Sequence, residues 1–299
     1  MNATDHGSGR ERQPEVVLLT GASTGLGLAI SRELLRREFR LILTARSESM
    51  HRFSEAGIVE NERVWLRPLN ITHEAERRQV VAEADRHWGG VDVLINNAGV
   101  AFRAVVEHVE ESQRRAQLDV NFRAPMELIR LVLPHMREVR GGRILNVSSV
   151  GGMMAMPTMA VYSASKFALE GMTESLWYEV RPWNIRVSLI QPGFIRSTSF
   201  QRTRYTDLSD AAQRTESDPY FPHYRHMSAF IARCMQRAGS TPEHVARVVM
   251  KTLDRRKPPL RVAGTMDAWL FDLVRRFLPR TLYHAILYRG LPRVNDWGR

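Results

Sequence analysis

Cysteine and long apolar runs are scarce in this sequence, and their scarcity excludes several classes of protein. The 299 residues include a single cysteine, Cys234, which excludes an intramolecular disulfide and favours a reducing compartment. Residues 1–14 are polar and no apolar stretch follows them, so we expect a flexible tail rather than a secretory signal. Even the C-terminal candidate for a membrane span is interrupted by Arg275, Arg276 and Arg280. We therefore expect a cytoplasmic protein, with any membrane contact peripheral.

Grouped metal ligands and a single basic stripe are missing as well. His223 and His226 lie close together, but no nearby cysteine or second cluster completes a ligand set, so we expect no metal site. The net charge of +11 is compatible with nucleic acid, an anionic membrane surface or an anionic cofactor as partner. Because arginine is spread along the whole chain, we expect no nucleic-acid partner. A steep salt dependence of DNA binding would revive that alternative.

Short apolar runs alternate with helical periodicity, and this alternation predicts the fold. Strands are predicted at 16–20, 41–44, 64–66, 91–95, 143–147 and 185–190, with an edge strand at 261–263. Helices are predicted at 74–87, 111–138 (kinked near Pro125), 161–180 and 241–253, while 197–238 has no clear period. The rhythm predicts an α/β fold, a doubly wound parallel, Rossmann-like sheet in one domain. We expect this catalytic, dinucleotide-binding domain at 15–263, followed by a helical appendage at 264–299.

A glycine-rich turn follows the first predicted strand and opens the first helix. It reads TGASTGLG, and its glycines would let the backbone turn tightly and approach a pyrophosphate at the helix N-terminus. The residues of this turn that we expect to contact a dinucleotide are Gly21, Ser23, Thr24, Gly25, Leu26 and Gly27.

The second predicted strand lacks an acidic residue at its end. A carboxylate there would accept hydrogen bonds from the ribose hydroxyls of NAD, whereas NADP needs a cation for its additional phosphate. This strand ends in Arg46 and Ser47, which offer a guanidinium and a hydroxyl donor. The cofactor that this pattern favours is NADP (NADPH).

Tyr162 and Lys166 are four residues apart on a predicted helix and so project from one face. A neighbouring ammonium favours the phenolate form of a tyrosine, which would make Tyr162 a useful acid and base near neutral pH. Ser148 and Ser149 end a predicted strand at the edge of the sheet where ligands of such folds bind. The segment Asn96-Asn97-Ala98-Gly99 follows another strand at that edge. Its small residues suit close approach to a cofactor ring.

Six motifs in register resemble the short-chain dehydrogenase/reductase family. They are TGASTGLG, NNAG, the asparagine of DVNFRAP, the serine of NVSSVGG, YSASK and QPGFIRS. The C-terminal stretch resembles more loosely the subgroup of 17β-hydroxysteroid and retinol dehydrogenases.

The resemblance implies a role for each matching residue. Tyr162 would be the general acid in reduction and the general base in oxidation. Lys166 would lower the pKa of Tyr162 and hydrogen-bond the nicotinamide ribose. Ser149 rather than Ser148 would polarise the substrate carbonyl. Asn121 would hold a water that links Lys166 to solvent. Asn70 and Ile71 are implied to contact the adenine of the cofactor, and Asn97, Ala98 and Gly99 its nicotinamide ribose. Pro192, Gly193 and Ile195 are implied to contact the nicotinamide amide, and Ser197 that amide or a phosphate. Asn70 stands where many members have aspartate, and Ser197 where threonine is frequent.

Two C-terminal regions are expected to surround the substrate. Residues 198–238, with aromatic side chains such as Tyr205, Tyr220 and Tyr224, would form a lid over an apolar pocket. Residues 266–291 place Trp269, Leu270 and other apolar side chains at helical spacing. That spacing fits a helix packed on protein, which we favour, or one bound at a membrane surface.

The function that we expect is NADP(H)-dependent interconversion of an alcohol and a ketone or aldehyde on a small apolar substrate, such as a steroid, retinoid or lipid. One alternative is a 3-oxoacyl reductase acting on a carrier-linked chain, because the basic surface would attract an acidic carrier. Another is a non-catalytic NADP-binding sensor or scaffold. Helices 111–138 and 161–180 pair subunits in relatives of the family, so a homodimer or homotetramer is expected by analogy.

Overall fold

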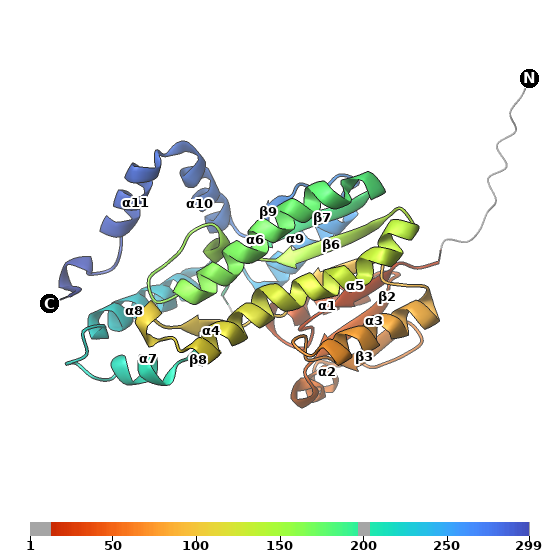
Figure 1. The fold of residues 1–299 in the computed structure, drawn as a ribbon, viewed down its shortest axis with the longest axis horizontal. Helices are drawn as coiled ribbons and strands as arrows, with labels where there is room; N and C mark the ends of the chain where they lie inside the picture. Colours follow the sequence, from red (N-terminus) through yellow and green to blue (C-terminus); the bar gives the residue numbers. More distant parts are fainter. Residues whose placement is uncertain (1–12, 197–203, 299) are drawn as a thin grey trace, which may run out of the picture.

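The computed structural model describes residues 13–196 and 204–298, and a seven-stranded parallel sheet lies at its centre (Figure 1). The strand order is β3-β2-β1-β4-β6-β7-β9, and all neighbours run in parallel. The strands are β1 (Val16–Leu19), β2 (Arg40–Ala45), β3 (Val64–Pro68), β4 (Val93–Asn96), β6 (Gly142–Val147), β7 (Ile185–Gln191) and β9 (Arg261–Ala263). The predicted doubly wound parallel sheet is thus confirmed, including the edge strand β9.

Helices cover both faces of the sheet, and the alternation along β1 shows why two cores form. Val17 and Leu19 pack with the side chains of α1 (Gly25–Leu35), α2 (His51–Glu55) and α9 (Pro242–Asp254). Val16 and Leu18 point to the opposite face and pack with α3 (Glu74–Trp88), α5 (Ala124–Glu138) and α6 (Ala160–Val180). Because successive strand residues face opposite sides, a fully apolar strand needs a helical layer on each side.

The strand order reverses its direction between β1 and β4, because β2 and β3 lie on one side of β1 and β4, β6 and β7 on the other. In open α/β sheets, ligands bind beyond the carboxyl ends of the strands at such a switch point. The loops after β1 and β4 therefore define where a site is to be sought.

The long helix predicted at 111–138 is divided into two. α4 (Glu111–Leu118) passes through a π-helical turn at Asp119–Arg123 into α5, so the interruption lies directly before Pro125, where a kink was predicted. Single π turns inside helices are rare and often lie at functional sites.

The sequence predicts no helical period for 197–238, and this prediction is wrong for most of that region. Arg204–Tyr205 forms β8, which pairs with β5 (Phe102–Arg103), and α7 (Asp207–Ala212) and the long helix α8 (Phe221–Arg237) follow. α8 buries only Tyr224, Met227 and Ile231 fully, at helical spacing. Their period is masked in the sequence by the histidines, arginines and aromatic residues of the exposed faces.

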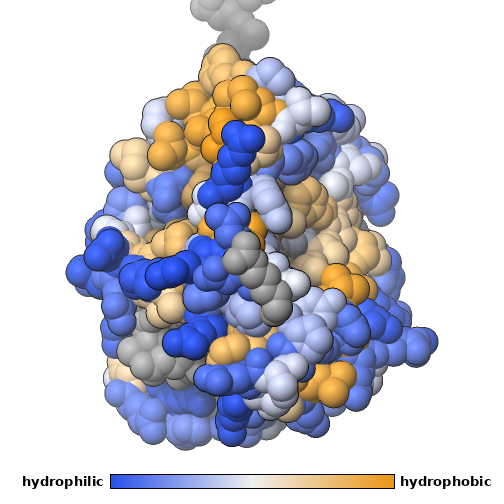
Figure 2. All heavy atoms as spheres, turned by 90° about the vertical axis from the view of Figure 1, so that its left-hand side faces the viewer, coloured by the Kyte–Doolittle hydropathy of each residue, from blue (hydrophilic) through white to orange (hydrophobic). Residues whose placement is uncertain are grey.

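The C-terminal stretch forms two helices, α10 (Met266–Phe277) and α11 (Arg280–Arg289), separated by Leu278 and Pro279. They pack on the segment after β6, where Met153 and Met154 meet Tyr283. Other apolar side chains of the pair are exposed, and Figure 2 shows apolar side chains gathered at the top of this end of the molecule, the level at which Figure 1 places the two helices. Within 13–196 and 204–298, none of the helices has the length and apolar character that crossing a bilayer requires.

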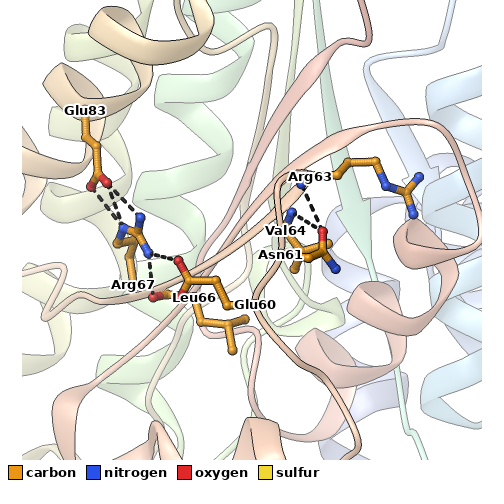
Figure 3. A network of polar contacts seen from close by, with 7 residues as sticks. All are labelled: Glu60, Asn61, Arg63, Val64, Leu66, Arg67 and Glu83. Carbon is orange, nitrogen blue, oxygen red and sulfur yellow. Dashed lines mark hydrogen bonds and ion pairs between the residues drawn. The ribbon is translucent and has the colours of Figure 1, made fainter.

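At the opposite edge of the sheet, polar contacts fix β3 (Figure 3). The Arg67 guanidinium donates to both carboxylate oxygens of Glu83 on α3 at 3.0 Å, and its Nη1 donates to Glu60 at 2.7 Å. The Asn61 side-chain oxygen accepts from the backbone N–H groups of Arg63 and Val64 at 2.9 and 3.0 Å. These bonds anchor the strand whose following loop, residues 69–72, reaches the ligand edge of the sheet.

Candidate active site

A cavity of about 1010 Å³ lies along the carboxyl edge of the sheet. It is lined by the segments that follow six strands, β1, β2, β3, β4, β6 and β7, as the switch point of the strand order leads one to expect. Most residues predicted from the sequence to form the site line it, namely Gly21, Ser23, Thr24, Gly25, Leu26, Gly27, Arg46, Asn70, Ile71, Asn97, Ala98, Gly99, Ser149, Tyr162, Lys166, Pro192, Gly193 and Ile195. Of the remaining three, Ser47 is exposed away from the lining, Asn121 is buried behind it, and Ser197 lies outside the described residues.

The glycine turn after β1 has a conformation that depends on glycine. Gly21 has a φ of +64° and Gly25 a φ of +54°, values that side chains with a Cβ rarely adopt. A Cβ at Gly27 would overlap the carbonyl oxygen of Gly21, so α1 can begin this close to the turn only with glycine there. The cavity wall at this point is therefore backbone, as a pyrophosphate site requires.

The side chain of Asn97, a lining residue, stabilises this turn. Its Nδ2 donates to the carbonyl oxygens of Thr20 and Gly21 at 3.0 and 3.1 Å. The Thr20 hydroxyl in return accepts from the backbone N–H groups of Asn97 and Ala98 at 3.0 and 3.1 Å. The loops after β1 and β4 are thus joined into one rigid unit.

The end of the cavity next to β2 and β3 is basic. Arg46 lines it and pairs with Glu48 at 3.1 Å, and both side chains are largely exposed. Ser49, at the end of a short 3₁₀ helix, and Arg52, on α2, also line this end. They could not be predicted from the sequence because these two short helices have no motif of their own. Asn70 is held by a hydrogen bond of 2.8 Å from the Thr72 hydroxyl to its Oδ1.

At the other end of the cavity, α6 places Tyr162 and Lys166 one turn apart against the same lining. The ammonium nitrogen of Lys166 lies 6.0 Å from the centre of the Tyr162 ring and donates to the Val147 carbonyl at 2.9 Å. Burial lowers the pKa of Lys166 to about 8, and the negative charge of Glu170, one turn further along α6, opposes that shift. The lysine thus loses its charge at a pH only slightly above neutral.

Ser149 lies two residues after the end of β6 and caps a short 3₁₀ turn, with its Oγ accepting from the backbone N–H of Gly151 at 3.0 Å. A Cβ on Gly151 would come within 2.9 Å of the Tyr162 ring, so glycine allows the turn to approach the phenol. Burial raises the pKa of Tyr162, and a hydrogen bond with Ser149 opposes this. The expected lowering of this pKa by Lys166 is therefore not what governs the phenol here. Desolvation is the larger effect and keeps the phenol protonated.

Asn121 lies in the π turn between α4 and α5 and is almost fully buried. Its Nδ2 donates to the Val100 carbonyl at 2.8 Å and to Ser165 Oγ at 3.0 Å, while its Oδ1 accepts from the Val100 N–H at 2.9 Å. The side-chain amide thus ties the loop after β4 to α6. That Asn121 also holds a water remains a prediction.

The loop after β7 is held by the C-terminal appendage, a contact that the sequence reasoning missed. The Thr265 hydroxyl accepts from the backbone N–H of Gly193 at 2.8 Å, and the Asp267 carboxylate accepts from that of Phe194 at 2.8 Å. A Cβ on Gly193 would overlap that carboxylate. The start of α10 therefore shapes the wall of the cavity.

The aromatic residues expected to line a substrate pocket from the lid are placed differently. Tyr224 is fully buried, and its hydroxyl accepts from the Val105 N–H at 3.0 Å. From the described part of the lid, Arg204 alone lines the cavity. The apolar lining near Gly99 comes instead from the loop after β4, from β5, from α4 and from the π turn, through Val100, Ala101, Phe102, Ala116 and Val120.

The amino-acid sequence of this chain is similar to that of known proteins over nearly the full length of the two relatives named here. The chain is 33% identical over 278 residues to a 3-ketodihydrosphingosine reductase of Bacteroides thetaiotaomicron, with 92% of this chain and 97% of the relative covered. It is 31% identical over 296 residues to retinol dehydrogenase 8 of Bos taurus, with 95% and 94% covered.

Solved structures show the same fold. A short-chain dehydrogenase from Streptomyces avermitilis is similar with a TM-score of 0.74 and 30% identity, covering 92% of this chain and 99% of that one. A metagenomic short-chain oxidoreductase in complex with NADP has a TM-score of 0.64 and 25% identity, covering 83% and 96%. The family model described as short chain dehydrogenase matches residues 15–208. The chain belongs to the short-chain dehydrogenase family and is an oxidoreductase.

Proposed function

We propose that this oxidoreductase uses NADP(H) to interconvert an alcohol and a ketone or aldehyde on an apolar substrate, with Tyr162 as its proton-transfer residue. The proposal rests on one observation, that both groups of residues line the same cavity. The glycine turn and Arg46 line one end of it, and Ser149, Tyr162 and Lys166 line the other. Its volume of about 1010 Å³ suits a large ligand. Its backbone-lined turn and its basic end match the pyrophosphate and the additional phosphate of NADP.

The chemistry at the other end follows from the side chains there. Bound NADPH supplies the hydride. As the substrate carbonyl carbon is reduced, its oxygen gains negative charge, which hydrogen bonds from Ser149 and Tyr162 stabilise. The Tyr162 proton passes to that oxygen and completes the alcohol, and Tyr162 then regains a proton from solvent. In oxidation the same proton moves in the opposite direction, from the alcohol to the phenolate.

The substrate class is supported by the apolar lining and by the relatives. Val100, Phe102 and Val120 offer a surface for hydrocarbon rather than for a sugar or an amino acid. The similar proteins named above act, by their names, on retinol and on 3-ketodihydrosphingosine, and both molecules carry an alcohol or a ketone on a largely hydrocarbon skeleton. We therefore propose a lipid-like, retinoid-like or steroid-like substrate.

The organisation of the chain is part of the proposal. We assign catalysis to residues 15–263, with 198–238 as a lid and 264–299 as an appendage whose Thr265 and Asp267 support the cavity wall. A cytoplasmic location and a homodimer or homotetramer remain predictions. Light scattering of the purified chain would measure the second.

Replacing Arg46 with Asp should weaken NADPH binding by about ten- to a hundredfold and change NADH binding much less, because a charge-assisted hydrogen bond to the additional phosphate is lost. Dissociation constants for both nucleotides, measured by fluorescence titration, test this. The matched control is Arg86→Asp, an exposed arginine on α3 outside the cavity lining. Equal weakening of NADPH and NADH, or an equal effect of the control, would show that Arg46 does not read the phosphate.

Replacing Glu170 with Gln should move the pH dependence of oxidation to lower pH. Burial lowers the pKa of Lys166 to about 8 even though the Glu170 carboxylate opposes that shift, so removal of the carboxylate lowers this pKa further and the lysine loses its charge at a lower pH. Because we expect the charged Lys166 to hydrogen-bond the nicotinamide ribose, the fall of kcat/KM on the alkaline side should begin at lower pH. Glu174→Gln is the control, because Glu174 also pairs with Arg261 but is more exposed. An unchanged pH profile, or the same shift in both variants, would show that the Glu170 carboxylate does not maintain the charge of Lys166.

A further inference from the structure

A second cavity, of about 620 Å³, lies between the C-terminal helix pair and the segment after β6. Its apolar walls come from Met153 and Met154, from Phe167 of α6, and from Leu278 and Leu287. Met153 and Met154 are almost fully buried, so the floor of the cavity is hydrocarbon and thioether. Among the described residues, it shares no lining side chain with the large cavity, and the turn Val150–Gly152 lies between the two in the chain.

The charged side chains in the lining of this cavity are both cationic. They are Arg275 and Arg280, with His284 beside them, and none of the described residues that line the cavity is acidic. All three are exposed, so they lie at the solvent side, above the buried methionines. The Arg275 guanidinium donates to the Met153 carbonyl and lies 5.7 Å from the Phe167 ring, which fixes it at the wall. In the described part of the chain, the Arg280 side chain has no ion-pair partner.

Tyr283 adds an unsatisfied donor to the same wall. Its side chain is 7% exposed, and its hydroxyl has no hydrogen-bond partner within 13–196 and 204–298. Burial raises the pKa of this phenol while the nearby charge of Arg275 opposes the shift, so the two groups lie close together. A buried hydroxyl without a partner costs free energy, and an incoming acceptor would remove that cost.

We propose that this cavity binds a single-chain amphiphile with an anionic headgroup, its hydrocarbon against Met153, Met154 and Leu287 and its carboxylate or phosphate at Arg280. An apolar interior of this volume fits a hydrocarbon chain, and the cationic rim attracts and orients an anion. A cationic or neutral amphiphile would gain the apolar contacts alone. This site is separate from the proposed oxidoreductase site and does not depend on turnover.

Titration of the full-length protein with dodecanoate, below its micelle concentration and followed by calorimetry, tests the proposal. We expect saturable binding of one molecule per chain, both with and without saturating NADPH. Arg280→Glu should weaken it about tenfold or more, because the headgroup then faces a like charge. Arg289→Glu makes the same charge change on the same helix outside the lining and should leave affinity within about twofold. Leu287→Trp, which fills the cavity, should abolish binding while the circular dichroism spectrum is retained.

Several results would overturn the proposal. If Arg280→Glu and Arg289→Glu weakened dodecanoate binding equally, dodecanoate would be adsorbing to a basic surface. If dodecanol or dodecyltrimethylammonium bound as tightly as dodecanoate, the anionic headgroup would have no role in binding. Displacement of dodecanoate by NADPH would place it in the large cavity instead. Binding to anionic phosphatidylglycerol vesicles without binding of free dodecanoate would identify the occupant as a bilayer surface. A failure of turnover in any assay leaves this test unaffected, because it measures binding alone.

Discussion

Tyr162→Phe should reduce kcat by roughly 10²- to 10⁴-fold, the usual contribution of a positioned acid–base group, while the dissociation constant for NADPH changes little. The phenylalanine ring retains the packing of the tyrosine against Gly151, so the substitution removes one hydroxyl and little else. Because burial raises the pKa of Tyr162, the wild-type phenol is protonated at neutral pH and is ready to donate in the direction of reduction. Steady-state kinetics and NADPH fluorescence titration of both proteins measure the two quantities.

Tyr178→Phe is the matched control for this experiment. Tyr178 lies on the same helix, α6, but is 62% exposed and does not line the cavity. We expect wild-type turnover from it. Turnover of Tyr162→Phe near the wild-type rate would remove Tyr162 from the mechanism and, with it, the basis for choosing this end of the cavity as the reactive one.

Ser149→Ala should lower kcat by about 10²- to 10³-fold, the range measured when one donor to a developing oxyanion is removed. The Ser149 side chain hydrogen-bonds to Tyr162, whereas the neighbouring Ser148 is buried and its hydroxyl has no partner within 13–196 and 204–298. Ser148→Ala is therefore the control. It removes an unpaired buried hydroxyl, so we expect unchanged or slightly increased stability and a loss of kcat below about tenfold.

Stopped-flow measurement of a single turnover separates the chemical step from product release in both serine variants. The rate of the chemical step should fall for Ser149→Ala and not for Ser148→Ala. The reverse order would assign the donor to Ser148, and equal effects would mean that the substitutions act by disturbing the turn after β6.

The strands and the ligand edge of the sheet could be predicted from sequence because their determinants are local. β1, for example, is a short apolar run that is soon followed by Gly21, and β6 is followed by the small polar pair Ser148 and Ser149. The pair Tyr162 and Lys166 could be found because a helix fixes the geometry of residues four apart.

The features that sequence reasoning missed depend on contacts between distant segments. The Asp267 carboxylate accepts a hydrogen bond from the N–H of Phe194, which is 73 positions away in the chain, and no local sequence pattern marks that contact. The position of Arg52 depends on how α2 packs, and the side-chain amide of Asn97 serves the turn after β1 only because β1 and β4 are neighbours. The direction of the Tyr162 pKa shift follows from its burial, which a sequence does not reveal.

Transfer of deuterium from NADPH labelled at the nicotinamide C4 position tests the central claim most directly. Wild-type protein and Tyr162→Phe would each be incubated with steroid, retinoid and long-chain ketones or aldehydes, and the products analysed by mass spectrometry. We predict that the wild type places one deuterium on the carbinol carbon of at least one product, and that the variant forms little of it. Tight binding of NADPH without label in any product would contradict the account and would favour a non-catalytic NADP-binding sensor.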